Sequence, residues 1–137
     1  MVIDSSAVIA ILFREPEAEW FETAILNDVL RYMSSASLVE SSIVLDRHYG
    51  DKAFSEADGF VLRMKIEIIP VTIEQAQVAR SAYQKYGRGR HKAALNFGDC
   101  FSYALAKVSG ESLLCKGNDF ALTDLAIVSP PPSPQNK

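Results

Sequence analysis

The sequence predicts a three-layer α/β fold, in which helices cover both faces of a mainly parallel sheet. Short β-branched segments alternate with longer stretches of helical periodicity, and strands separated by helices in this way pair in parallel. The 137 residues fit one domain, and 48% apolar with 23% charged residues is usual for a globular protein. We therefore expect a single folded domain over residues 1–129.

Five short segments have the composition of strands. Val2 and Ile3 are β-branched and are followed at once by polar residues, whereas Ile66-Glu67-Ile68-Ile69-Pro70-Val71 is the clearest strand of the chain. The others are shorter apolar runs between helical stretches. The predicted strands cover residues 2–3, 30–33, 66–71, 111–115 and 125–129.

Six stretches show helical periodicity, and residues with known capping preferences stand at their ends. Ser5 or Ser6 is the expected N-cap of the first helix. Thr72 and Gln75 form the pattern of a capping box, and Gly110 ends the last helix. The predicted helices follow Ser6 and Pro16 and then cover residues 35–48, 53–64, 73–86 and 96–109.

The overall charge does not indicate a nucleic-acid binder, because the net charge is −3 and the isoelectric point is about 5.4. No apolar run approaches the roughly 20 residues of a membrane span, and a first strand beginning at Met1 leaves no room for a signal peptide. Cys100 and Cys115 lack metal-type spacing, and we expect buried, reduced thiols of a cytoplasmic protein. The proline-rich residues 130–137 are expected to be disordered.

Asp4 is the first residue with a candidate chemical role. It follows the first strand directly, and open parallel sheets bind their ligands beyond the carboxyl ends of the strands. Asp119 lies in a similar place, shortly after the strand over residues 111–115. Either residue alone is also compatible with an ordinary turn or loop aspartate.

Two further acids lie on predicted helices. Glu40 has apolar neighbours four positions before it and three and four positions after it, and a carboxylate beside an apolar face is costly unless paired or metal-bound. Asp99 stands at the third helical position after Asn96, where an acid stabilises the helix start and completes a cap. Gly98 is a poor helix former that lets another group approach the backbone.

Together the four acids predict a metal site. Clustered carboxylates repel and raise one another's pKa, so such a cluster usually serves to hold a cation. Ligands that are all oxygen select hard ions, here Mg²⁺ or Mn²⁺. A carboxylate-bound Mg²⁺ activates water and stabilises charge on a phosphoryl group, which is the chemistry of many nucleases. The predicted catalytic and metal-binding residues are Asp4, Glu40, Asp99 and Asp119.

A glycine-rich segment between the last two predicted helices carries a cluster of positive charge. It contains Arg88, Arg90, His91 and Lys92. Exposed runs of charge are often ordinary solvated loops. Beside an acidic metal cleft, however, the same residues would bind a phosphate backbone.

These residues occur in an order and spacing that resemble the PIN-domain ribonucleases of the VapC type, the toxins of bacterial VapBC toxin–antitoxin pairs. The resemblance spans residues 1–128 and is carried by the segments at 1–7, 34–40, 95–101 and 113–120. It implies a PIN fold, divalent-metal-dependent cleavage of RNA, a VapB-type antitoxin and a toxin homodimer. The expected RNA contacts are Ser5, Arg88, Arg90, Lys92 and Lys116.

The sequence departs from the usual pattern of this family after the strand over residues 111–115. Many members carry Thr or Ser there and an acid or amide two residues later, whereas this chain has Cys115, Gly117 and a displaced acid at Asp119. Ser5 stands where Thr is commoner, which keeps a hydroxyl beside the metal. Metal coordination is therefore expected first of Asp4 and the two helical acids.

Two other functions are compatible with part of the pattern. A signalling receiver domain also has early acids on a parallel sheet, but Asp46 and Asp51 fall on or after a helix instead of at the end of a strand. A PIN-like scaffold that binds RNA or protein without catalysis is the alternative, although such a scaffold has no reason to keep buried like charges.

The early helices carry more apolar residues than one core face needs. Leftover apolar surface usually marks an interface, and we expect it to bind the antitoxin. The residues concerned are Ile11, Leu12, Phe13, Trp20, Phe21 and Tyr49.

Overall fold

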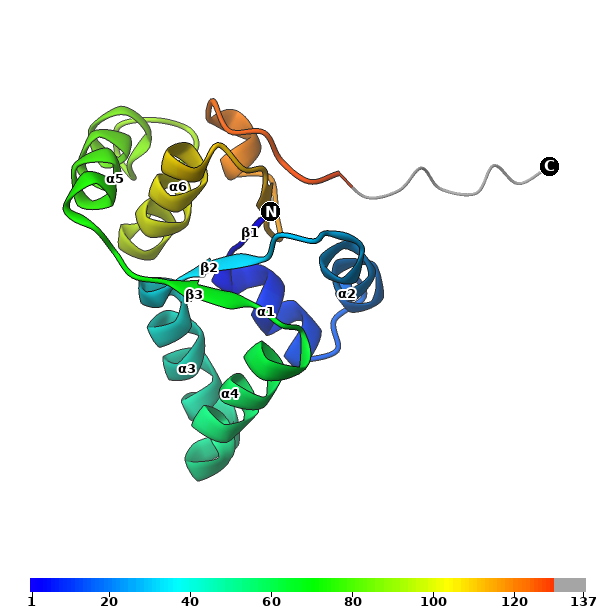
Figure 1. The fold of residues 1–137 in the computed structure, drawn as a ribbon. Coiled ribbons are helices and arrows are strands. Elements are labelled where there is room, and N and C mark those ends of the chain that lie inside the picture. The colour runs from blue at the N-terminus through cyan, green and yellow to red at the C-terminus, as the bar shows by residue number, and fades with distance from the viewer. Residues whose placement is uncertain (130–137) are drawn as a thin grey trace.

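Four short parallel strands form the central sheet of the structure, a computed structural model that describes residues 1–129. The strands are β1 (Val2–Ile3), β2 (Tyr32–Ser34), β3 (Glu67–Ile69) and β4 (Leu113–Leu114). They lie in the order β3-β2-β1-β4, and every neighbouring pair is parallel. Figure 1 labels β3, β2 and β1 at the centre of the molecule. The predicted parallel α/β fold is therefore confirmed. The tail over residues 130–137, predicted to be disordered, lies outside the described residues.

The strand order predicts a ligand-binding crevice beyond the carboxyl end of β1. β2 and β3 extend the sheet on one side of β1, whereas β4 lies on its other side. Parallel sheets bind ligands beyond the carboxyl ends of the strands at the point where the strand order reverses in this way. Asp4 follows β1 at this point, and its backbone N–H donates to the Leu114 carbonyl oxygen at 2.9 Å.

The helices of residues 1–129 agree with the predicted ones to within a few residues. They are α1 (Ser5–Leu12), α2 (Ala18–Asn27), α3 (Ser35–Tyr49), α4 (Ala53–Arg63), α5 (Ile73–Tyr86) and α6 (Phe97–Ser109). Short 3₁₀ turns cover Gly50–Lys52 and Phe120–Leu122. Ser34 caps α3, Asn96 caps α6, and Gly110 ends α6 in the left-handed conformation with a φ of 74°.

Three local details differ from the prediction. The N-cap of α1 is Asp4 instead of Ser5 or Ser6, because β1 ends after two residues and the helix begins at once. Thr72 does cap α5, but the Gln75 side chain donates to the Pro70 carbonyl oxygen and does not close a capping box. The predicted strand over residues 125–129 is a single parallel bridge between Leu113 and Ile127.

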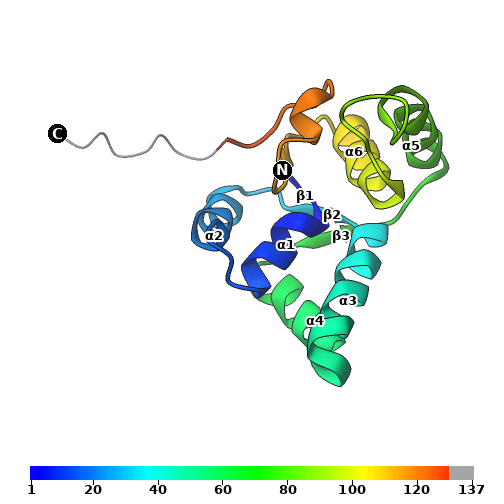
Figure 2. The same ribbon diagram turned by 180° about the vertical axis from the view of Figure 1, so that it is seen from behind.

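Successive residues of the strands pack into separate cores on the two faces of the sheet. Val2 and Leu113 belong to a core that includes α5 and α6, whereas Ile3 and Leu114 belong to one that includes α1, α2 and α4. Figure 1, and Figure 2 from behind, show these helical layers on either side of the strands. Leu45 of α3 forms a third small cluster with residues of α4.

Three expectations about the class of protein can be compared with the structure: the receiver-domain alternative, the state of the cysteines and the membrane-spanning segments. Asp46 lies inside α3 and Asp51 in the 3₁₀ turn that follows, so neither ends a strand as the phosphoacceptor of a receiver domain would. Cys100 and Cys115 are both buried and unbridged, as predicted. Among residues 1–129, no helix combines the length and apolar character that crossing a bilayer requires.

Candidate active site

Asp4 lies at the carboxyl end of β1 with only 3% of its surface exposed. Its Oδ2 accepts a hydrogen bond from the Ser6 backbone N–H at 3.0 Å, which caps α1. Its Oδ1 accepts from the Ser102 hydroxyl at 2.5 Å. Protein donors therefore hold both oxygens in place, and each oxygen keeps a further lone pair for another ligand.

Glu40 reaches from α3 to the start of α6. Its Oε1 accepts a hydrogen bond from the Ser5 hydroxyl, and its Oε2 lies against the backbone of Gly98. A Cβ atom added at Gly98 would stand 1.9 Å from Oε2 and 2.6 Å from Cδ, so any side chain there would collide with the carboxylate. The prediction that Gly98 permits a close approach is confirmed, and the group that approaches is Glu40.

Asp99 caps α6 and also faces the other acids. Its Oδ2 accepts from the Asn96 N–H while Asn96 Oδ1 accepts from the Asp99 N–H, each at 2.9 Å. The pKa of Asp99 is raised to about 6, chiefly by burial and also by the charges of Asp4, Glu40 and Asp119, while the Asn96 bond opposes this increase. No donor of residues 1–129 binds Oδ1. One oxygen thus caps the helix and the other is left to the crevice.

Asp119 is an exposed residue directly before the 3₁₀ turn Phe120–Leu122. The chain reaches it through Gly117, whose φ of 89° is in the range that favours glycine. The pKa of the Cys115 thiol is raised to about 12, chiefly by burial and also by the charges of Asp4, Asp99 and Asp119. Asp119 therefore acts electrostatically on the same group as Asp4 and Asp99, and the buried Cys115 is a neutral thiol.

The donor atoms of this crevice suit a hard divalent cation. All four acids offer carboxylate oxygens, and within residues 1–129 neither Oε2 of Glu40 nor Oδ1 of Asp99 has a hydrogen-bond donor. No three Asp, Glu, His or Cys side chains of this part of the chain already stand in the geometry of a bound ion. The acids nevertheless act on one another, since three of them raise the pKa of Asp99. A cation bound among them would offset that repulsion.

Three of the predicted RNA contacts lie on the loop between α5 and α6. Arg88, Arg90 and Lys92 are exposed, and none takes part in an ion pair within residues 1–129. The Arg90 guanidinium lies 5.8 Å from the ring centre of Tyr83. The positive charge of this loop is therefore available to a bound anion.

Lys116 and Ser5 have partners within the chain. The Lys116 ammonium pairs with Glu15 and lies 3.6 Å from Glu17 Oε2. These glutamates, the first of them above all, raise the pKa of Lys116. The Ser5 hydroxyl donates to Glu40. Ser5 is thus placed to orient an acid, and Lys116 to hold the loop after β4 against the segment between α1 and α2.

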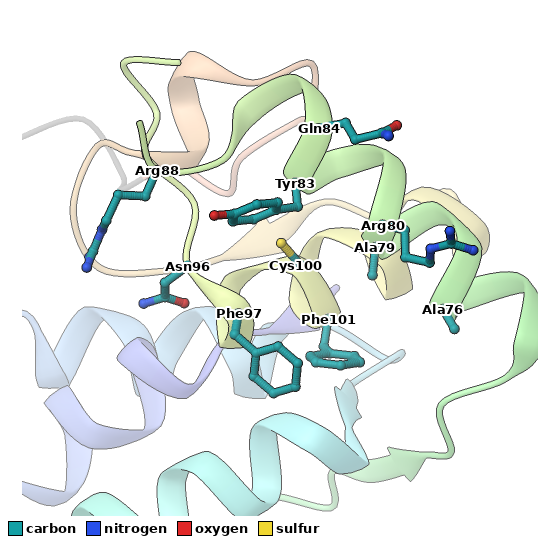
Figure 3. A pocket seen from close by; sticks show the side chains of 10 residues that line it. All are labelled: Ala76, Ala79, Arg80, Tyr83, Gln84, Arg88, Asn96, Phe97, Cys100 and Phe101. Carbon is teal, nitrogen blue, oxygen red and sulfur yellow. The ribbon is translucent and has the colours of Figure 1, made fainter. Parts of the chain in front are cut away.

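Two features near the acids were not predicted. Ser102 of α6 and Ser37 of α3 are buried beside Asp4, with their Oγ atoms 3.1 Å apart. The sequence signal for Ser102 is that it is the one hydroxyl-bearing aliphatic side chain in the otherwise apolar or aromatic run from Cys100 to Ala106. The second feature is a largely apolar cavity of about 720 Å³ between α5 and α6, which the aromatic rings of Tyr83, Phe97 and Phe101 border together with arginines (Figure 3).

Two of the six apolar residues predicted to leave free surface on the early helices are buried. Ile11 and Phe21 belong to the core, so the prediction is wrong for these two. The other four keep some exposed surface: Leu12, Phe13 and Trp20 are half-buried, and Tyr49 is exposed. A cavity of about 630 Å³ does lie among α1, α2 and α4, but charged side chains form much of its lining: Arg14, Glu19, Glu22, Glu56 and Arg63.

Comparison with known proteins identifies the family to which the chain belongs. Residues 1–125 match the PIN domain family. A ribonuclease VapC from Mycolicibacterium smegmatis is 52% identical over 128 residues, which cover 93% of this chain and 99% of that protein. Among solved structures, VapC20 of Mycobacterium tuberculosis, a toxin described as cleaving the sarcin–ricin loop, has a TM-score of 0.75 at 19% identity and covers 94% of this chain and 98% of its own. A toxin–antitoxin complex from Klebsiella pneumoniae contains a chain with a TM-score of 0.68 at 17% identity, covering 95% and 97%.

The parallel sheet with acids at the end of its first strand is thus the fold of a PIN domain. The two solved structures support the fold, and the sequence relative carries the assignment further. The chain belongs to the PIN-domain family and, within it, to the VapC ribonucleases of VapBC toxin–antitoxin pairs.

Proposed function

We propose that this chain is a toxin that cleaves RNA internally by hydrolysis of phosphodiester bonds, with the help of Mg²⁺ or Mn²⁺. The observation that supports this most directly is the gathering of Asp4, Glu40 and Asp119 around the half-buried Asp99, where burial and these three charges together raise the pKa of Asp99 to about 6. Gathering like charges destabilises a fold, so the arrangement favours a site that is completed by a cation. Membership of the VapC ribonucleases makes RNA the substrate class.

The residues of the chain have distinct roles in this proposal. A divalent ion, when bound, lowers the pKa of a water molecule and stabilises negative charge on the phosphoryl group. Asp4, Glu40 and Asp99 would hold it, with Asp119 at the exposed edge. The Ser5 hydroxyl orients the Glu40 carboxylate, and the Ser6 N–H and Ser102 hydroxyl orient that of Asp4, so these two side chains need little reorientation to bind an ion.

Metal removal tests the proposal. We expect the purified chain to cleave single-stranded RNA in the presence of Mg²⁺ or Mn²⁺ and to stop in excess EDTA, because the crevice supplies carboxylates but no alternative Lewis acid. Activity should return when Mn²⁺ is added beyond the EDTA concentration. RNA binding without cleavage in any of these metals would instead favour the alternative, a non-catalytic PIN-fold module that binds RNA or protein.

The substrate path in this proposal runs over the basic loop between α5 and α6. Arg88, Arg90 and Lys92 are exposed there, whereas Lys116 is already paired with Glu15. Replacing the three loop cations by Gln should weaken RNA binding and flatten its salt dependence, by about 0.7 in the log–log slope for each lost contact to a single strand. Titrations of labelled RNA in EDTA across a salt series measure this.

The control for the loop variant removes the same charge elsewhere. Arg47, Lys52 and Arg63 are exposed on α3, α4 and the turn between them. Their replacement by Gln should leave both the affinity and the salt slope close to those of the unsubstituted chain. Equal behaviour of the two triple variants would move the RNA path away from the loop.

We also propose a homodimer and a VapB-type antitoxin partner. Phe97 is 80% exposed beside the α5–α6 cavity, and Val39 of α3 is 59% exposed, which supports contact with a second copy on this face. The charged cavity among α1, α2 and α4 is the corresponding site for the antitoxin. Light scattering of the purified chain measures the homodimer, and co-expression with a VapB-type protein followed by purification measures antitoxin binding. A monomeric chain would contradict the dimer, and a chain that recovers no VapB-type protein would contradict the partner.

We propose a cytoplasmic location as well, which the two unbridged thiols support.

A further inference from the structure

A chain of buried hydroxyl groups connects Asp4 to the interior of the protein. Ser102, fully buried on α6, donates to Asp4 Oδ1 at 2.5 Å across 98 positions of the sequence. Ser37 is buried on α3, and its Oγ lies 3.1 Å from that of Ser102. The start of α1, which Asp4 caps, thus meets α3 and α6 at three polar side chains.

The direction of these hydrogen bonds follows from the number of protons. A serine hydroxyl has one proton to donate, and an ionised carboxylate only accepts. Ser102 gives its proton to Asp4, so in the bond between the two serines Ser37 is the donor and Ser102 the acceptor. The chain therefore runs from Ser37 through Ser102 to Asp4, and each donor strengthens the next bond by polarising it.

Packing alone does not explain these serines. Ala104 and Ala106 occupy equally buried positions of α6, so an alanine is readily accommodated in this helix. A buried hydroxyl without a partner is costly, and it adds no apolar contact. The feature that accounts for Ser102 is the carboxylate that it contacts.

We infer that Ser102 is a positioning residue for Asp4. The Ser6 N–H holds Oδ2 from the start of α1, and the Ser102 hydroxyl holds Oδ1 from the interior. Two donors on different elements fix the rotation of the carboxylate, so its remaining lone pairs stay directed into the crevice. Ser37 acts one step further away by orienting the Ser102 hydroxyl. This inference rests on the proposed function, in which Asp4 is a metal ligand.

Ser41 provides a matched control. It is as deeply buried as Ser37, and its hydroxyl donates to the Ser37 carbonyl oxygen at 2.8 Å without contacting an acid. Ser41→Ala therefore removes a buried hydroxyl of the same size, and its effects report the structural cost alone.

The test measures metal binding apart from activity. Mn²⁺ affinity of the RNA-free chain is read from the electron paramagnetic resonance signal of the free ion, and kcat and KM for RNA are determined separately. Ser102→Ala should weaken Mn²⁺ binding and lower kcat, each by about 10- to 100-fold, as is typical when a metal ligand loses its outer hydrogen-bond partner. KM should change little, because the basic loop is untouched. Ser37→Ala should have a smaller effect, and Ser41→Ala none.

Several outcomes would overturn the inference. One is a Ser102→Ala variant that binds Mn²⁺ and cleaves RNA like Ser41→Ala, and another is a larger loss in Ser37→Ala than in Ser102→Ala. If Ser102→Ala does not fold, Ser102→Cys replaces it, because a thiol of similar size is a weaker donor and should give an intermediate loss. Failure of the proposed function is distinct from these results, because the unsubstituted chain would then neither bind Mn²⁺ nor cleave RNA.

Discussion

Asp99→Asn is expected to abolish RNA cleavage while making the protein more stable at neutral pH. The substitution removes a ligand charge from the crevice, so the loss of activity should exceed the roughly 100-fold seen when only an outer partner of a ligand is lost. The helix cap should survive, because the new amide oxygen can still accept from the Asn96 N–H that Asp99 Oδ2 now binds at 2.9 Å. Cleavage assays in Mn²⁺ measure the first effect.

The stability effect of Asp99→Asn has a defined pH dependence. Burial and the neighbouring carboxylates together raise the pKa of Asp99 from 3.8 to about 6, so the folded state holds this proton more tightly than the unfolded chain does. The resulting contribution to stability is complete below about pH 4 and is lost as the pH rises through 6. An asparagine does not ionise. In thermal melts with EDTA, the variant should therefore gain most over the unsubstituted chain above pH 6, and the gain should shrink toward pH 4.

Asp58→Asn is the control for both measurements. Asp58 is exposed on α4, so its replacement should alter neither cleavage nor the pH dependence of the melting temperature. An Asp99→Asn variant that cleaves RNA at the rate of the unsubstituted chain would remove Asp99 from the site. A variant that is less stable than the unsubstituted chain at every pH would show that capping outweighs charge repulsion at this position.

The acids could be located from sequence because each depends on local rules. Asp4 comes directly after a strand, and the parallel topology then places it in the crevice. Asp99 follows Asn96 at the spacing of a capping box, and the structure contains that box. The absence of a side chain at Gly98 was enough to predict that another group approaches its backbone. The sequence did not reveal that this group is the Glu40 carboxylate.

Contacts between distant parts of the chain could not be predicted in the same way. Ser102 and Asp4 are 98 positions apart, and Lys116 and Glu15 are 101 apart, so no local pattern joins either pair. The burial of Ile11 and Phe21 depends on distant contacts as well. Both were expected to leave free surface, but they pack in one core with Phe60 of α4, which depends on how the helices meet. The hydrophobic pattern of a helix predicts which of its residues are apolar on one face. It does not predict which other helix or strand covers that face.

Gly98→Ala is expected to remove activity with little change in stability. Gly98 is in the first turn of α6 and its φ is not in the left-handed range, so alanine fits the backbone and should favour the helix by up to about 1 kcal/mol. Its Cβ would stand 1.9 Å from Glu40 Oε2. The atom in its way is the end of a flexible side chain, which can move aside at low cost. Moving aside, however, takes the carboxylate out of the crevice and breaks its bond with the Ser5 hydroxyl.

Three comparisons isolate this displacement of Glu40. Gly59→Ala is the matched control, because Gly59 lies within α4 and a Cβ there meets no atom within 4 Å; it should raise the melting temperature slightly and leave cleavage unchanged. Gly98→Ala should lose both cleavage and Mn²⁺ affinity to about the extent of Glu40→Ala. In a chain that already carries Glu40→Ala, adding Gly98→Ala should cost no further activity, because two changes that act through one group are not additive. If the two losses instead multiply, or if Gly98→Ala cleaves RNA normally, the position of the Glu40 carboxylate against α6 does not matter for the reaction.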